Sequence, residues 1–204
     1  MRFSELKDRA LEKLDPVWWP SVGVTLVYFF VSSTASSSTF YFGGVVVFGP
    51  LGVGLANYYL KISRNQETKI EDLFVGFQNF GNTFLLGLLQ GLFIVLWSFL
   101  FIIPGIIAAL AYSQAFYIMA DDPTIKPMDA LKKSREMMDG YKWDLFLLGL
   151  SFIGWALLCI LTLGIGFLWL TPYMQATFAQ FYFELKGDEG VELIEEFGID
   201  TDFD

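Results

Sequence analysis

LWSFLFIIPGIIAALAYSQAFYIMADDP, residues 96–123, is an apolar stretch interrupted by Pro104 and Gly105 and closed by Asp121 and Asp122. Proline ends a helix because it lacks an N–H and clashes with the preceding turn, and glycine tolerates a chain reversal. The stretch therefore predicts two apolar helices that meet at Pro104 and Gly105, which is the form of a membrane hairpin.

Charged residues are missing from three long runs of the 204-residue chain, 16–60, 73–120 and 145–183. A helix crosses the roughly 30 Å hydrocarbon core in about 20 residues, so each run has room for two crossings and a turn. A soluble helical protein with such runs would have helices without a solvated face. We therefore predict an all-α polytopic membrane protein with six transmembrane helices arranged as three hairpins.

An amphipathic segment precedes each hairpin, around residues 2–15, 73–80 and 127–138, and such segments are typical of helices that lie in the membrane interface. A shift of 58 residues aligns Gly91 with Gly149. A shift of 61 residues aligns the Tyr112 and Gln114 pair with Tyr173 and Gln175, and the first third of the chain is more diverged. The pattern predicts a quasi-threefold repeat of interfacial helix and hairpin. Five glycines in the span from about 40 to 60 predict a central, closely packed helix.

The 13 Lys and Arg residues lie before, between and after the apolar runs, never at the hairpin tips. The positive-inside rule then predicts a cytoplasmic N-terminus and C-terminus, with the turns at 32–39, 104–105 and 162–166 outside. We divide the chain into a membrane domain, 1–186, and an acidic cytoplasmic tail, 187–204.

The net charge of −9 belongs almost wholly to that tail, which holds eight acidic and no basic residues. The other 186 residues carry 13 basic and 14 acidic groups, so no basic face remains for nucleic acid. The tail interleaves apolar residues with its acids and is a candidate contact for a membrane or cytoplasmic protein partner. Membrane lipids are the other expected partners, and the oligomeric state stays open.

The chain has no histidine, which excludes histidine-based triads and imidazole metal sites. No ionisable acid or base lies within an apolar run, whereas proton and sodium pumps usually carry one there. Asp121 and Asp122 are weak candidates for a divalent cation, and a helix stop is the alternative reading of adjacent acids before proline. We expect no metal, no cofactor and no catalytic residue.

The uncharged polar residues within or near the apolar spans are Asn57, Gln90, Tyr112, Gln114, Tyr173, Gln175 and Gln180. The candidate site consists of five of them, Asn57, Tyr112, Gln114, Tyr173 and Gln175. Ordinary hydrogen bonds between helices would explain them. Alternatively, the two repeat-related pairs converge in a central polar cavity that binds a lipid headgroup or a peptide.

The sequence resembles the bacterial integral-membrane family known as domain of unknown function 975. The matching pieces are GPLGVGLANYYLKISR (49–64), LFVGF (73–77), residues 96–123, ALKKSREMMDGYKWDLFLLGLSFIGW (130–155) and LTLGIGFLWLTPYMQATFAQFY (161–182). The resemblance implies a six-helix protein of the bacterial cell membrane, distantly similar to the membrane portions of some glycerophosphodiester phosphodiesterases. It implies no catalytic residues.

Together these features favour a non-enzymatic membrane protein that binds, scaffolds or assembles membrane components. The alternative is a passive or partner-driven transport component for a neutral or lipid-like ligand, and a lipid-active enzyme comes third.

Overall fold

The computed structural model describes residues 3–37, 42–162 and 164–197. Regular structure in this part of the chain is all helix, without a strand. The elements in order are α1 (Phe3–Leu14), η1 (Asp15–Val17), α2 (Trp18–Ser37), α3 (Phe42–Ser63), η2 (Ile70–Phe77), α4 (Phe80–Leu100), α5 (Ile102–Ala111), α6 (Ala115–Asp121), α7 (Pro127–Met137), α8 (Lys142–Leu150), α9 (Ile153–Leu161) and α10 (Phe167–Phe197). Of the predicted acidic tail, residues 198–204 lie outside the described part.

Five segments of the described chain are long and apolar enough to cross a membrane. They are Phe3–Thr34, Gly43–Ser63, Phe80–Phe99, Ile102–Asp121 and Lys142–Leu161. The predicted all-α class with membrane-length helices is thereby confirmed. The last predicted span, within α10, is not one of the five, because polar residues such as Gln175 and Gln180 interrupt its apolar sequence.

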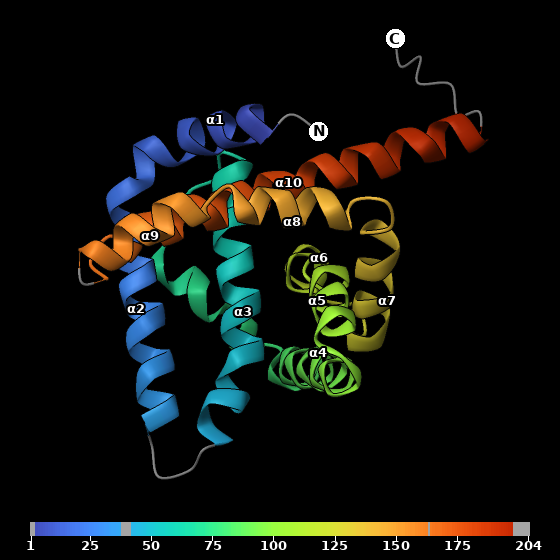
Figure 1. Ribbon diagram of the computed structural model, residues 1–204, viewed down its shortest axis with the longest axis horizontal. Coiled ribbons are helices and arrows are strands. Elements are labelled where there is room, and N and C mark those ends of the chain that lie inside the picture. Colours follow the sequence, from blue (N-terminus) through green and yellow to red (C-terminus); the bar gives the residue numbers. More distant parts are fainter. Residues whose placement is uncertain (1–2, 38–41, 163, 198–204) are drawn as a thin grey trace.

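The long helices lie in antiparallel pairs that point in different directions (Figure 1). α2 and α3 run side by side, and α9 and α10 run side by side across the top of the view. α4 packs against α5, and this pair is seen nearly end-on. The three pairs thus border the central part of the molecule from different sides.

α3 is a central helix on which several other elements pack, as its glycines predict. It contacts α2, α4, α6, α10 and η2. A Cβ atom at Gly49 would overlap the carbonyl oxygen of Thr83 at the start of α4, and one at Gly54 would overlap that of Leu73 in η2. Side-chain-free positions thus let two neighbouring backbones approach α3 closely.

The short amphipathic elements pack on helices of a different pair. α1 buries Leu6, Ala10 and Leu14 completely and packs along α10, where Arg9 bonds to Glu184 at 3.2 Å. η2, which leads into α4, packs on α3. α7, which leads toward α8, packs on α4 and α6. Each element therefore connects two neighbouring pairs, and α1 joins the first pair to the last.

The turn between α4 and α5 lies earlier than predicted. Phe101 is extended, at φ −161° and ψ 152°, and α5 already begins at Ile102. Pro104 stands in the first turn of α5, where its missing N–H would have no helical partner in any case, so it starts this helix instead of ending the previous one. Gly105 allows close packing, because a Cβ atom there would overlap Ser98 of α4.

Candidate functional site

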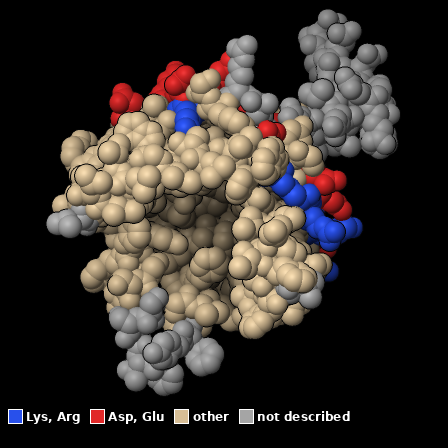
Figure 2. Space-filling view, in the orientation of Figure 1, with Lys and Arg blue, Asp and Glu red and all other residues tan. Residues whose placement is uncertain are grey.

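A cavity of about 560 Å³ lies where the three helix pairs converge. Figure 2 shows the molecule hollowed at its centre, with Lys, Arg, Asp and Glu at its upper and right rims. The described lining is mostly apolar and aromatic and includes no charged side chain. Its lining residues are Tyr28, Phe48, Gly52, Leu55, Ala56, Gln90, Leu110, Ser113, Gln114, Phe116, Tyr117, Leu145, Phe146, Gly149, Leu150, Ile153, Gln175 and Phe178.

One membrane-length segment breaks beside this cavity, between α5 and α6 at residues 112–114. The Ser134 hydroxyl of α7 donates to the Ala111 carbonyl at 2.8 Å and accepts from the Gln114 backbone N–H at 3.2 Å. The Gln90 amide of α4 donates to the Tyr112 carbonyl at 3.1 Å. Neighbouring side chains therefore satisfy backbone groups that the break frees, as a non-helical backbone inside a membrane requires.

A second break divides α8 from α9 at residues 151–152. Gly149, Leu150 and Ile153, on either side of it, line the cavity. We predicted continuous spans here and at 112–114, so both breaks are corrections. Neither is marked by a proline at the break itself. In membrane proteins, interrupted helices often border a binding site.

Two glutamine side chains line the cavity with unpaired carbonyl oxygens. Gln90 is 7% exposed and Gln114 is 1% exposed, and neither Oε1 atom has a hydrogen-bond partner among the described residues. The Gln90 Nε2 donates to the Tyr112 carbonyl, and the Gln114 Nε2 donates to Ser113 Oγ at 3.1 Å. The Ser113 hydroxyl in turn donates to the Leu110 carbonyl at 2.8 Å. Each amide nitrogen thus donates one hydrogen bond, whereas neither side-chain oxygen accepts one from a described residue.

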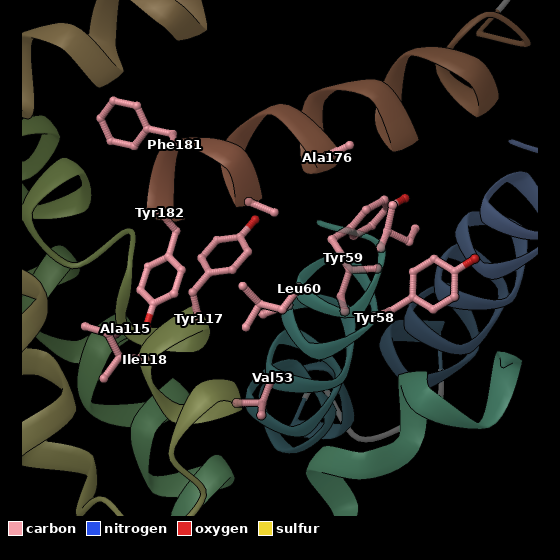
Figure 3. Packing of buried hydrophobic residues seen from close by; sticks show 14 of the residues in the cluster. Val53, Tyr58, Tyr59, Leu60, Ala115, Tyr117, Ile118, Ala176, Phe181 and Tyr182 are labelled. Atoms are coloured by element: carbon pink, nitrogen blue, oxygen red, sulfur yellow. The ribbon is translucent and has the colours of Figure 1, made fainter. Parts of the chain in front are cut away.

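At the charged end, a layer of tyrosines separates the cavity from an ion-pair cluster. The Tyr117 hydroxyl donates to Gln175 Oε1 at 3.3 Å, and its ring stacks on Tyr182 at 5.7 Å between centroids. Figure 3 shows these two side chains next to each other between α6 and α10. The Tyr182 hydroxyl donates to Asp121 Oδ2 at 3.1 Å, and Lys186 Nζ bonds to the same oxygen at 2.5 Å.

Asp121 and Asp122, the weak metal candidates, have separate local roles in the structure. Asp121 pairs with Arg64, which directly follows α3, as well as with Lys186 of α10, so it connects three helices. Asp122 accepts from the Thr124 hydroxyl at 2.6 Å and from its backbone N–H at 3.0 Å. These two bonds hold the pKa of the Asp122 carboxyl below its usual range. Among the described residues, no group of three or more possible metal ligands occurs.

The structure brings only part of the predicted site to the cavity. Gln114 lines it from the break before α6, and Gln175 lines it from α10. Tyr112 lies outside the lining with its ring 5.9 Å from Phe93, and Tyr173 packs edge-on at 5.3 Å against Phe152. Asn57 lies on α3 outside the lining, with a buried Nδ2 that has no partner among the described residues. The repeat-related glutamines thus share the cavity, and the tyrosines beside them pack on aromatic rings.

Gln90 and Tyr117 are polar cavity residues that lie outside the predicted site. Tyr117 follows Gln114 by three residues, a spacing that places both on one helix face. That periodicity was available as a signal. Gln90 offered no comparable pattern, because its position depends on how α4 packs beside the break at Tyr112.

These features define a class of protein: an all-helical chain with membrane-length helices around an uncharged cavity. The chain belongs to the family described as protein of unknown function (DUF975), whose model matches residues 1–108 and 99–189. The resemblance to this family that the sequence predicts is thereby confirmed. No curated protein and no solved structure matches the chain. Similarity to the membrane portions of glycerophosphodiester phosphodiesterases stays a prediction.

Proposed function

We propose that this chain is an integral membrane protein that binds a lipid-like molecule in its central cavity. The observation that carries the proposal is the cavity itself, which combines apolar walls with buried, uncharged amides at the meeting point of the helix pairs. Such a lining suits an amphiphile with a long apolar part and a small polar part. Binding of this kind is one form of the non-enzymatic role that the sequence favours.

The distribution of apolar surface supports a membrane setting. Phe99, Ile102 and Leu161, near the turns of two pairs, are among the most exposed apolar side chains of the described chain. A soluble protein rarely exposes apolar residues in such continuous bands. Charged residues gather at the opposite end, where Arg64, Asp121 and Lys186 meet. The separation of apolar surface from charged surface supports a chain of six membrane spans. The charged end and both termini would then lie in the cytoplasm of a bacterial cell.

The packing of the short elements supports the proposed quasi-threefold repeat. One arrangement recurs three times, in which an amphipathic element packs on another helix pair. It is seen for α1 on α10, for η2 on α3, and for α7 on α4 and α6. Gln114 and Gln175, aligned by the sequence repeat, both line the cavity. The cavity would then lie on the pseudo-symmetry axis, at about the middle of the bilayer.

Transport of the bound molecule is the second candidate function. Tyr117, Tyr182 and Asp121 form a continuous chain of contacts between the cavity and the charged end. A transport component would have to break these contacts in order to release a ligand to that side. Because they are intact here, the arrangement favours binding over passage. The acidic tail, 187–204, remains a proposed contact for a protein partner.

The proposal is tested by photo-crosslinking in lipid nanodiscs. The probes carry a diazirine in the acyl chain and differ in the head: phosphatidylcholine, phosphatidylethanolamine or monoacylglycerol. We expect at least one probe to label peptides that line the cavity. Gly149→Leu should reduce this labelling, because Gly149 lines the cavity and a side chain there meets open space.

Gly154→Leu is the matched control. Gly154 follows the same helix break, also has open space around it and is not part of the cavity lining. This variant should retain the labelling. If none of the three probes labels the cavity of the unmodified protein, the proposed function is wrong.

A further inference from the structure

We infer that the bound lipid reaches the cavity from the side, and that one acyl chain runs through an apolar groove with its end in the cavity. This inference rests on the proposed function and specifies which part of the ligand the same site takes. It depends on a second space of about 560 Å³ beside the cavity. This groove is lined by Tyr28 and Ser32 of α2, by residues of α3 between Gly44 and Phe48, and by residues of α4 between Gly87 and Val95.

The groove and the cavity adjoin. Tyr28 and Phe48 line both spaces. On α3 the cavity continues from Phe48 to Ala56, whereas the groove continues from Phe48 back to Gly44, near the start of the helix. On α2 the groove reaches Ser32, which is closer than Tyr28 to the end of that helix. The groove therefore extends the cavity toward the turn of the α2–α3 pair.

The groove is open toward the lipid. Val45, Leu92 and Val95 line it, and each of these side chains is about half exposed. The described residues of its lining include no charged side chain. In a membrane protein, exposed apolar side chains of this kind face the acyl chains of the bilayer. An acyl chain can therefore enter the groove without crossing a charged surface.

The floor of the groove on α4 contains two glycines with different surroundings. A Cβ atom at Gly87 would overlap Gly49 of α3, so Gly87 serves helix packing. A Cβ atom at Gly91 would meet open space. Gly91 thus leaves room in the groove that no described side chain of the protein fills.

A single acyl chain fits this shape better than a helix of a second copy or of another protein. An α-helix with its side chains is about 10 Å across, so it would cover the groove and leave the cavity empty. A flexible chain can bend at the junction between Tyr28 and Phe48 and bury its methylene groups in both spaces. The continuity of groove and cavity therefore favours a lipid as the occupant.

The direction of the chain follows from the geometry of a bilayer, in which the heads lie at the surface and the chain ends lie near the middle. A lipid that keeps the orientation of its neighbours would place its head near the turn and its chain end in the cavity. The cavity wall agrees with this direction. The amides of Gln90 and Gln114 are bound at the α5–α6 break, and most of the lining is apolar or aromatic.

The test compares two versions of each of the three nanodisc probes, with the diazirine near the end of the acyl chain or near its carboxyl group. In the unmodified protein, we expect the chain-end versions to label cavity peptides of α6 and α8. The carboxyl-end versions should label the α4 peptide that contains Gly91 and Val95. The reverse pattern, or equal labelling of the cavity by both versions, would overturn the inference.

A first pair of variants tests the groove as the route. Gly91→Leu should remove most of the cavity labelling by the chain-end probes, although Gly91 lines only the groove of the two spaces. Gly81→Leu is the matched control, because Gly81 also lies on α4 with open space around it and lines neither space. The control should retain the labelling.

A second pair applies if Gly91→Leu does not fold. Val95→Trp places a large side chain in the open part of the groove and should also reduce the cavity labelling. Leu96→Trp is its control, since Leu96 is the next residue of α4, is exposed and lines neither space. Equal cavity labelling in Val95→Trp and Leu96→Trp would contradict the proposed route.

Two results separate this inference from the function on which it rests. If the probes label the cavity but never the groove, or if filling the groove leaves the cavity labelling unchanged, the inference is wrong and the proposed binding function stands. If no probe labels the cavity, the proposed function fails, and the inference fails with it.

Discussion

At the scale of single residues, glycines decide how closely the helices approach. Gly54 of α3 faces the backbone of η2, and Gly49 faces the backbone at the start of α4. Gly91, in contrast, has open space around its Cα atom. The glycines of this chain therefore differ in role, although they look alike in the sequence.

Gly54→Ala should destabilise the fold, because the added methyl group meets a backbone carbonyl that cannot rotate away. Overpacking of this kind costs roughly 1–3 kcal/mol. Gly91→Ala should be neutral or stabilising, since alanine favours a helix over glycine by about 1 kcal/mol. Thermal unfolding of the detergent-solubilised variants, followed by circular dichroism, measures both. Equal unfolding temperatures for the two variants would contradict the close contact at Gly54.

The packed glycines of α3 were predicted from composition, and Gln114 and Gln175 of the cavity from repeat spacing. Spacing could not distinguish Gln114, which lines the cavity, from Tyr112, which packs on Phe93. The two residues are close neighbours in the chain, and a break in the helix changes their directions. Which of them faces inward therefore depends on tertiary packing and not on helical periodicity.

At the scale of elements, the charged end is held by contacts between helices that are distant in sequence. Asp121 at the end of α6 pairs with Arg64, just after α3, and with Lys186 from α10. Its side chain is 13% exposed, so water screens these pairs only in part. The sequence showed the adjacent acids but not their partners, because ion pairs between distant segments leave no local pattern.

Asp121→Asn should lower the stability by about 1–2 kcal/mol, because two basic side chains lose a shared, partly buried partner. Asp139→Asn is the control. The exposed Asp139 pairs locally with Lys142 at 2.8 Å, so this substitution should change the stability little. Unfolding temperatures in one detergent at neutral pH provide the comparison. An Asp139→Asn variant as unstable as Asp121→Asn would argue against the inter-helix cluster.

The helix breaks and turns show where sequence reasoning succeeds at this scale. The turn near Gly164 lies where it was predicted, and Gly164 has a φ of +86°, which glycine adopts without strain. The turn at Phe101 was missed because Pro104 is equally compatible with starting a helix and with ending one. Packing of α5 on Ser98 selects the first of these possibilities.

At the scale of the whole molecule, each short amphipathic element connects two neighbouring helix pairs. α1 closes this arrangement by packing along α10 near the other end of the chain. The hydrophobic faces of these elements were predictable from their periodicity, and Leu6, Ala10 and Leu14 are indeed buried. Their partners were not predictable, because periodicity identifies a buried face and not the surface that covers it.

The proposed orientation is tested by labelling single cysteines in intact cells with a membrane-impermeant maleimide. The background is Cys159→Ser, which removes the one native thiol. Phe101→Cys and Ile165→Cys, at exposed positions in two of the turns, should react from outside. These positions are preferable to Gly105 and Gly164, where packing on Ser98 or a positive φ disfavours a side chain.

Arg64→Cys and Lys133→Cys should react only after the cells are opened, because positively charged segments remain on the cytoplasmic side. Lys133→Cys is the better test of topology, because Arg64 also pairs with Asp121 and its replacement removes that ion pair. Detection of all four cysteines in opened cells establishes that each variant is present and accessible. Labelling of Lys133→Cys in intact cells would show that the chain has the opposite orientation to the one proposed. It would also place the Asp121 cluster, and the tyrosine layer beneath it, on the outer side of the cavity.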